Sequence, residues 1–178
     1  MTYYGGKDLA ASFRTVRKNT LAIAEEIPED KYGFRAVPEM MSAGEMLAHI
    51  AVYPMWQIQV HTEKIDHLDF AFFTARTQKF HEDQAALKTK TEIVRALKEN
   101  GERFAAFLEA LDEATLSSTV SFPPPVQPSS KTRFEMLLGA KEHEMHHRGQ
   151  LMQMQRMIGQ VPHLTRARQQ MQAQAAAR

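Results

Sequence analysis

The sequence predicts an all-α protein, built as a four-helix bundle. Long stretches carry apolar residues at helical spacing, no stretch shows the alternation typical of strands, and glycine and proline are sparse and clustered. A chain of 178 residues with 43% hydrophobic and 24% charged residues is typical of one globular domain. We expect the bundle to occupy residues 1–162 and a tail rich in Gln, Ala and Arg to occupy residues 163–178.

The first predicted helix runs from Lys7 to Ile27 and ends at Pro28. A connector over residues 29–41 leads to the second helix, which Ser42 and Glu45 begin as a capping box. Pro54 lies inside this helix and removes one backbone hydrogen bond, so we expect a kink about one turn after His49.

The segment 62–80 holds four phenylalanines and predicts the end of the second helix, a turn and a short extra segment. A second capping box, Thr89 with Glu92, begins the third helix, which should reach about Leu111. Four prolines between Thr115 and Ser130 predict an extended crossover without helix.

The fourth predicted helix runs from Lys131 to Ile158, with Gly159 and Pro162 as stop signals. The tail from His163 has no acidic residue and predicts a frayed or partner-dependent helix.

Composition excludes several classes of function. A formal net charge of +1 and a pI near 8.0 argue against nucleic acid and anionic membranes as partners. No apolar run approaches the length of a transmembrane helix, and the N-terminus lacks the pattern of a secretory signal, so we expect a cytoplasmic protein. The absence of cysteine excludes a disulfide framework, thiolate metal sites and a cysteine nucleophile.

Three histidines carry the chemical information. His143 and His147 are four residues apart, so on a helix their imidazoles lie on one face, within the apolar stripe that must face the core. His49 lies on the core-facing stripe of the second helix, beside Tyr53 and Trp56.

Buried imidazoles need partners for both ring nitrogens, which hydrogen bonds or a shared metal can supply. Both solutions remain open from the residues alone, although a third inward histidine on another helix favours the metal. His146 falls at the edge of the stripe. The sequence does not identify a catalytic acid or base.

Other residues near this face have two interpretations each. Gln150 could orient substrate or bond to a neighbouring helix, and Tyr53 and Trp56 could line a pocket or fill the core. Arg148 is expected to form an ion pair either with Glu144, four residues earlier, or with another helix. We expect four further residues of the ambiguous region at the surface or rim: His61, Glu63, His67 and His81.

Two segments resemble the DinB/YfiT-like family. Residues 34–50, FRAVPEMMSAGEMLAHI, are similar to the family's pattern of an arginine, a proline and a capped helix ending in a histidine. Residues 143–151, HEMHHRGQL, are similar to its histidine block followed by Arg-Gly-Gln in the last helix. The helical layout agrees over about residues 7–160, and the second segment is the more specific.

The resemblance implies an up-down-down-up bundle, often dimeric, with a divalent metal held by His49, His143 and His147. Zinc and nickel are the commonest metals of such proteins, and iron or manganese suits some members. Relatives are thiol-dependent S-transferases or isomerases, and others are predicted hydrolases. The connector here reads Phe-Arg-Ala-Val-Pro over residues 34–38, where relatives often have Trp-Arg-Pro, so the substrate class does not carry over.

Two functional hypotheses follow. The first is a metal-dependent enzyme that acts on a small-molecule substrate at the open positions of a three-histidine site. It would be either an S-transferase, with a low-molecular-weight thiol as co-substrate, or a hydrolase. The second is a non-catalytic, stress-induced dimeric bundle that only binds metal.

Overall fold

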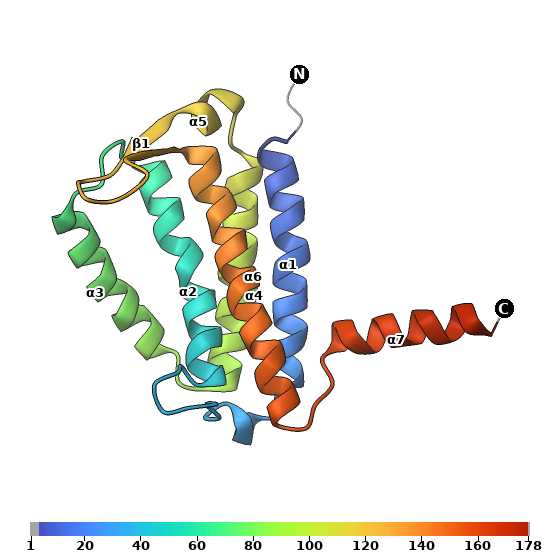
Figure 1. Cartoon of the computed structure of the whole chain (residues 1–178). Helices are drawn as coiled ribbons and strands as arrows, with labels where there is room; N and C mark the ends of the chain where they lie inside the picture. Colours follow the sequence, from blue (N-terminus) through green and yellow to red (C-terminus); the bar gives the residue numbers. More distant parts are fainter. Residues whose placement is uncertain (1–3, 178) are drawn as a thin grey trace.

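The computed structural model describes residues 4–177, and four long helices dominate it (Figure 1). The bounds of these helices are Gly6–Glu26 for α1, Ala43–Thr62 for α2, Lys90–Glu109 for α4 and Arg133–Met157 for α6. Each of α1 and α2 packs against both α4 and α6. In Figure 1, α1 and α6 run downwards while α2 and α4 run upwards. The prediction of a mainly helical chain is confirmed.

Local sequence signals explain where two of these helices begin. The Ser42 side chain accepts a hydrogen bond from the Glu45 N–H, and the Glu45 carboxylate accepts one from the Ser42 N–H. Thr89 and Glu92 form the same reciprocal pair at the start of α4. Both predicted capping boxes are therefore present.

The core lies between these helices. Phe13 of α1 and Phe104 of α4 meet edge to face with ring centroids 4.9 Å apart, and both are fully buried. At the end of the same contact, a Cβ on Gly6 would collide with the carbonyl oxygen of Leu108. Glycine therefore allows α1 and α4 to approach closely at this end.

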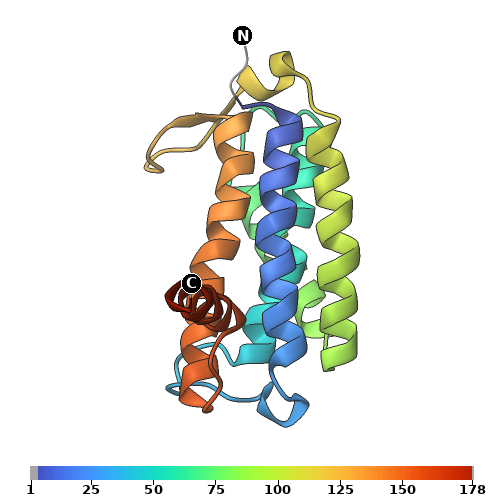
Figure 2. The same cartoon turned by 90° about the vertical axis from the view of Figure 1, so that its right-hand side faces the viewer.

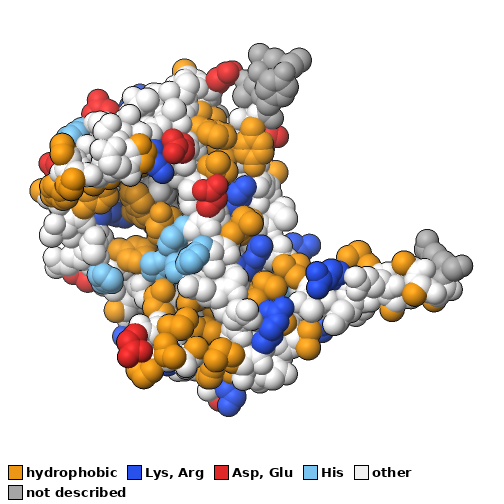
Figure 3. All heavy atoms as spheres, in the orientation of Figure 1, with side chains coloured by type: hydrophobic (Ala, Val, Ile, Leu, Met, Phe, Trp, Pro, Cys, Tyr) orange, Lys and Arg blue, Asp and Glu red, His pale blue; other side chains and the backbone are white. Residues whose placement is uncertain are grey.

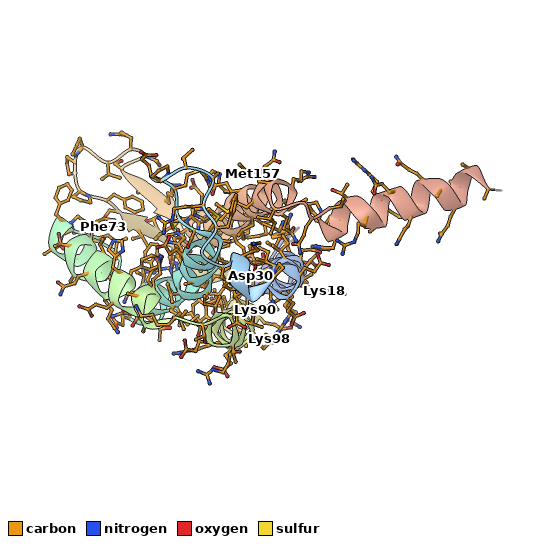
Figure 4. The ribbon with its side chains drawn as sticks, turned by 90° about the horizontal axis from the view of Figure 1, so that it is seen from below. Lys18, Asp30, Phe73, Lys90, Lys98 and Met157 are labelled. Carbon is orange, nitrogen blue, oxygen red and sulfur yellow. The ribbon has the colours of Figure 1, made fainter. Side chains whose placement is uncertain are left out.

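A turn follows the end of α2 at Thr62, as predicted, but the extra segment after it is a helix of 17 residues, α3 (Phe70–Ala86), and not a short one. Asp69 begins it by accepting a hydrogen bond from the Phe72 N–H. None of its residues is buried, and α3 packs against α2. Seen from below, with Phe73 marking its N-terminal part, α3 lies outside the group of long helices (Figure 4).

The segment between α4 and α6 also departs from the prediction of an extended crossover without helix. Asp112 caps a short helix, α5 (Glu113–Ser117), by accepting a hydrogen bond from the Thr115 N–H. Strand β1 (Thr119–Ser121) then pairs antiparallel with β2 (Ser130–Thr132). The prolines lie in the loop between the strands, which explains why they exclude helix there and not before it. A 3-10 turn, η1 (Glu29–Lys31), interrupts the connector before α2.

The tail forms α7 (His163–Ala176), which projects away from the other helices (Figures 1 and 2). None of its residues is buried. Among the described residues, no helix combines the length and the apolar character needed to cross a membrane.

Candidate metal centre

The structure brings His49, His143 and His147 together. His49 comes from the middle of α2, and the other two come from successive turns of α6. The Nε2 atom of His143 lies 3.1 Å from Nε2 of His49 and 3.2 Å from Nε2 of His147. One donor atom from each ring lies within 4.8 Å of the others. Figure 3 shows histidine side chains gathered on one face of the molecule, beside a hollow with hydrophobic walls.

These separations suit a shared ion. Bonds of 2.0 to 2.1 Å from a metal to imidazole nitrogens place neighbouring nitrogens about 2.9 to 3.4 Å apart, depending on the coordination geometry. Hydrogen bonds alone satisfy the cluster less well, because one Nε2–H of His143 can be donated to only one of its two neighbours. The donor set therefore fits a divalent ion that accepts imidazole, such as zinc, nickel or iron.

Burial keeps these rings in the neutral form that binds metal. The pKa of His49 is lowered to about 4, mainly by loss of hydration and next by the nearby His147, while a hydrogen bond with Gln84 opposes the shift. The same loss of hydration lowers the pKa of His143 to about 3 and also lowers that of His147. At neutral pH all three lone pairs are available for coordination.

Gln150 holds the ring of His147. Its Oε1 atom accepts a hydrogen bond from Nδ1 of His147 over 2.8 Å, which leaves the Nε2 lone pair facing the other histidines. Gln150 therefore bonds within its own helix α6 and not to a neighbouring helix. By contrast, Nδ1 of His143 is buried without a hydrogen-bond partner among the described residues.

Aromatic rings hold the cluster in place from α2 and α3. The Tyr53 ring stacks on His143 with centroids 3.8 Å apart and planes inclined by 16°. Phe80 meets His49 edge to face at 5.0 Å. Tyr53 is half-buried and lies beside the centre, so it forms part of the wall and not of the deep core.

Two cavities adjoin His49. A cleft of 870 Å³ opens between the connector, the first half of α2 and the end of α3, and its wall includes Glu45, His81 and Gln84. A smaller pocket of 190 Å³ lies between α2 and α3, and Tyr53 and Trp56 line it. Of the three predicted pocket residues, Tyr53 and Trp56 lie along this pocket while also packing against the core, and Gln150 is absent from the walls of both cavities.

The comparisons with known proteins agree with this geometry. A sequence profile of the DinB superfamily matches residues 12–151. The chain belongs to the DinB superfamily. A similar solved structure is a DinB-like protein, YjoA, from Bacillus subtilis, with 25% sequence identity and a TM-score of 0.65. The likeness covers 86% of this chain and 92% of that one. No match was found among curated proteins.

Two predictions about the surroundings of these histidines need correction, those for His61 and Glu144, whereas the position of His146 agrees with the sequence. His61 is buried and not at the rim, because its Nδ1 accepts a hydrogen bond from Arg133 and its Nε2–H donates one to Gln57. Glu144 pairs with Arg17 and not with Arg148. His146 is exposed, and its ring packs against that of His147 without joining the group of converging nitrogens.

The pair of Arg17 and Glu144 lies behind the histidines in the core of the DinB fold. The guanidinium donates to both carboxylate oxygens, to the carbonyl of Leu97 and to that of Ile50. Glu144 follows His143 in the chain, and Ile50 follows His49. Neither this contact nor the contribution of Phe80 and Gln84 from α3 could be predicted from the local sequence pattern.

Proposed function

We propose that this DinB-superfamily protein is a metal-dependent enzyme that binds a divalent metal through His49, His143 and His147. The observation that carries the proposal is the convergence of three neutral imidazole nitrogens from two helices beside open cavities. We also assign the four long helices to the up-down-down-up bundle topology, on the basis of their directions in Figure 1.

Three protein ligands leave coordination positions for a reactant, as catalytic sites do. When bound, the ion supplies Lewis-acid chemistry, which suits either hydrolysis or the activation of a thiol. The residues around it have defined tasks. Gln150 fixes the tautomer of His147, Tyr53 restrains the ring of His143, and the cleft of 870 Å³ admits the reactants.

Thiol transfer is the reaction we favour, with hydrolysis second. The chain has no cysteine, so the nucleophilic sulfur would come from a low-molecular-weight thiol as co-substrate. No carboxylate stands within hydrogen-bond distance of the three rings among the described residues, so a dedicated general base for water is not provided there. A thiol whose pKa is lowered by the ion needs less help from such a base.

Metal content tests the proposal first. We expect nearly stoichiometric zinc, nickel or iron in untagged wild-type protein, and its loss in His143→Ala, measured by plasma mass spectrometry. His146→Ala is the matched control, because it removes the exposed neighbour and should leave the metal in place. A wild-type protein that stays metal-free after incubation with these ions and manganese would overturn the site.

Activity is tested next on the loaded protein. Thiols are combined with electrophiles, and esters and amides are screened in parallel. Turnover that disappears in His143→Ala and survives in His146→Ala supports the enzyme. Stoichiometric metal without turnover in any of these reactions would favour the non-catalytic alternative.

A further inference from the structure

The pocket between α2 and α3 has walls that point to a ligand class. Five aromatic side chains line it beside His49, those of Tyr53, Trp56, Phe72, Phe73 and Phe80. Arg76 is the one lining side chain that is charged at neutral pH. The pocket is therefore an aromatic chamber with one cation.

The size of the pocket restricts the ligand to about one ring. Its volume is 190 Å³. An apolar cavity of roughly 150 Å³ in another protein is large enough to hold benzene. A single aromatic ring with one small substituent therefore fits, whereas a fused polycyclic compound does not.

Arg76 is short of partners. Its Nη1 donates to the side-chain oxygen of Gln59, and its Nε is buried without a hydrogen-bond partner in the part of the chain that the structure describes. Among the described residues, no carboxylate lies within ion-pair distance of its guanidinium. Asp83 and Glu63 attract the guanidinium only from beyond contact distance, and each is bonded to another side chain, Asp83 to Lys79 and Glu63 to Gln59. An anionic group on a ligand can therefore pair with Arg76 directly.

Arg76 and His49 line the same pocket, so one ligand can contact both. Phe80 contacts the ring of His49, and Arg76 lies one helical turn earlier on α3, about 6 Å along the axis. This spacing is comparable to the length of a substituted benzene ring. One end of such a molecule can reach the histidine cluster while a carboxylate at the other end meets the guanidinium.

We propose that this pocket binds the substrate itself, a single-ring aromatic carboxylate or an apolar carboxylate of similar size, with Arg76 as its anion partner. The inference rests on the proposed function, because the reacting end of the ligand is assigned to the metal. It adds the substrate class, which the three histidines do not define.

Fluorine NMR on zinc-loaded and metal-free protein tests the pocket with three probes. The probes are 4-fluorobenzoate, which has ring and anion, fluorobenzene, which lacks the anion, and trifluoroacetate, which lacks the ring. Trp56 is the only tryptophan of the chain, so its indole N–H signal reports binding at this pocket without ambiguity. We expect 4-fluorobenzoate to bind at least 10-fold more tightly than fluorobenzene and to shift this signal, and trifluoroacetate to leave it unmoved.

Two pairs of variants separate charge from shape. Arg76→Gln should weaken 4-fluorobenzoate about 10-fold or more and leave fluorobenzene within 2-fold, whereas Arg103→Gln, on an exposed residue of α4, should change neither. Thr77→Phe fills the pocket and should abolish both interactions. Thr74→Phe adds the same ring to an exposed position of α3 outside the pocket and should preserve them.

The outcomes distinguish this inference from the proposed function. Metal binding with no shift of Trp56, or 4-fluorobenzoate affinity that is unchanged in Arg76→Gln, overturns the substrate class while the metal centre stands. A carboxylate that binds only to the ion would give the second of these results. The protein could instead take up no metal and still show a shift of the Trp56 indole N–H signal that depends on Arg76. That result supports the pocket and overturns the metal-dependent function.

Discussion

Helix α6 carries two polar clusters side by side, and they differ in how completely they are paired. Glu144 points to the interior and shares hydrogen bonds with Arg17, whose donors also reach two main-chain carbonyls. One residue earlier, His143 has a buried Nδ1 without a partner within residues 4–177 and an Nε2 shared between two other rings. A closed cluster of this kind holds a fold together, whereas an open one leaves capacity for a ligand.

The closed cluster joins all four long helices through one side chain. Arg17 belongs to α1, and its guanidinium reaches Ile50 of α2, Leu97 of α4 and Glu144 of α6. Gly101 makes room for it, because a Cβ there would come within 2.9 Å of the Arg17 side chain. The rotation of α6 that Glu144 fixes is also the rotation that turns His143 and His147 towards α2.

Breaking the closed cluster should give the largest effect on stability. Glu144→Gln leaves the buried guanidinium of Arg17 without its counter-charge, and we expect a loss of about 3 to 5 kcal/mol in the free energy of unfolding. Chemical denaturation of metal-free protein measures this loss. Glu142→Gln, on an exposed neighbour, should change it by less than about 0.5 kcal/mol, and equal effects in both variants would refute the assignment.

Altering the support of the open cluster should act on the metal instead. Gln150→Ala removes the acceptor that orients His147, and we expect a 10- to 100-fold lower metal affinity, measured by competition with a chelator. Gln153→Ala, at an exposed position of the same helix, is the control and should bind metal as the wild type does. A variant at Gln150 with unchanged affinity would show that the contact plays no part in coordination.

A third cluster, formed by His61, Gln57 and Arg133, should make the free energy of unfolding depend on pH. Burial, and next the charge of Arg133, lower the pKa of His61 to about 4, against about 6.5 in an unfolded chain. Between these values the unfolded state binds more protons, so the folded state loses stability as the pH falls below about 6.5. From pH 7 to pH 5.5 we expect His61 to contribute a loss of about 1 kcal/mol.

Comparison with His61→Gln isolates this contribution, because the other histidines are common to both proteins. The free energy of unfolding of the variant should fall by about 1 kcal/mol less than that of the wild type over the same range. Parallel pH profiles for the two proteins would mean that the pKa of His61 is the same in the folded and unfolded states.

The open cluster was within reach of the sequence because its geometry is mostly local. His143 and His147 lie on one helix, so their spacing alone places both rings on one face. The capping box at Ser42 fixes the start of the helix that carries His49. Helical periodicity then places all three on apolar stripes. Their role as ligands stays a prediction that metal analysis must decide.

The closed cluster was out of reach, because Arg17 and Glu144 are 127 residues apart and neither has a local signal for the other. The nearer Arg148 looked like the better partner on helical spacing alone. Helix α3 was missed for a different reason. It buries no residue and so lacks the apolar stripe that marks the other helices, although Asp69, three residues before Phe72, is a recognisable helix start.

His49 belongs to the walls of both cavities, which follow one another along the pair α2 and α3. On α3, the residues up to Phe80 border the aromatic pocket, and the residues from His81 onwards border the cleft. A protein with two chambers at one centre can hold two reactants at the same time. Steady-state kinetics of the proposed transfer should therefore follow a sequential mechanism, with intersecting double-reciprocal lines, and neither product should leave before both reactants have bound.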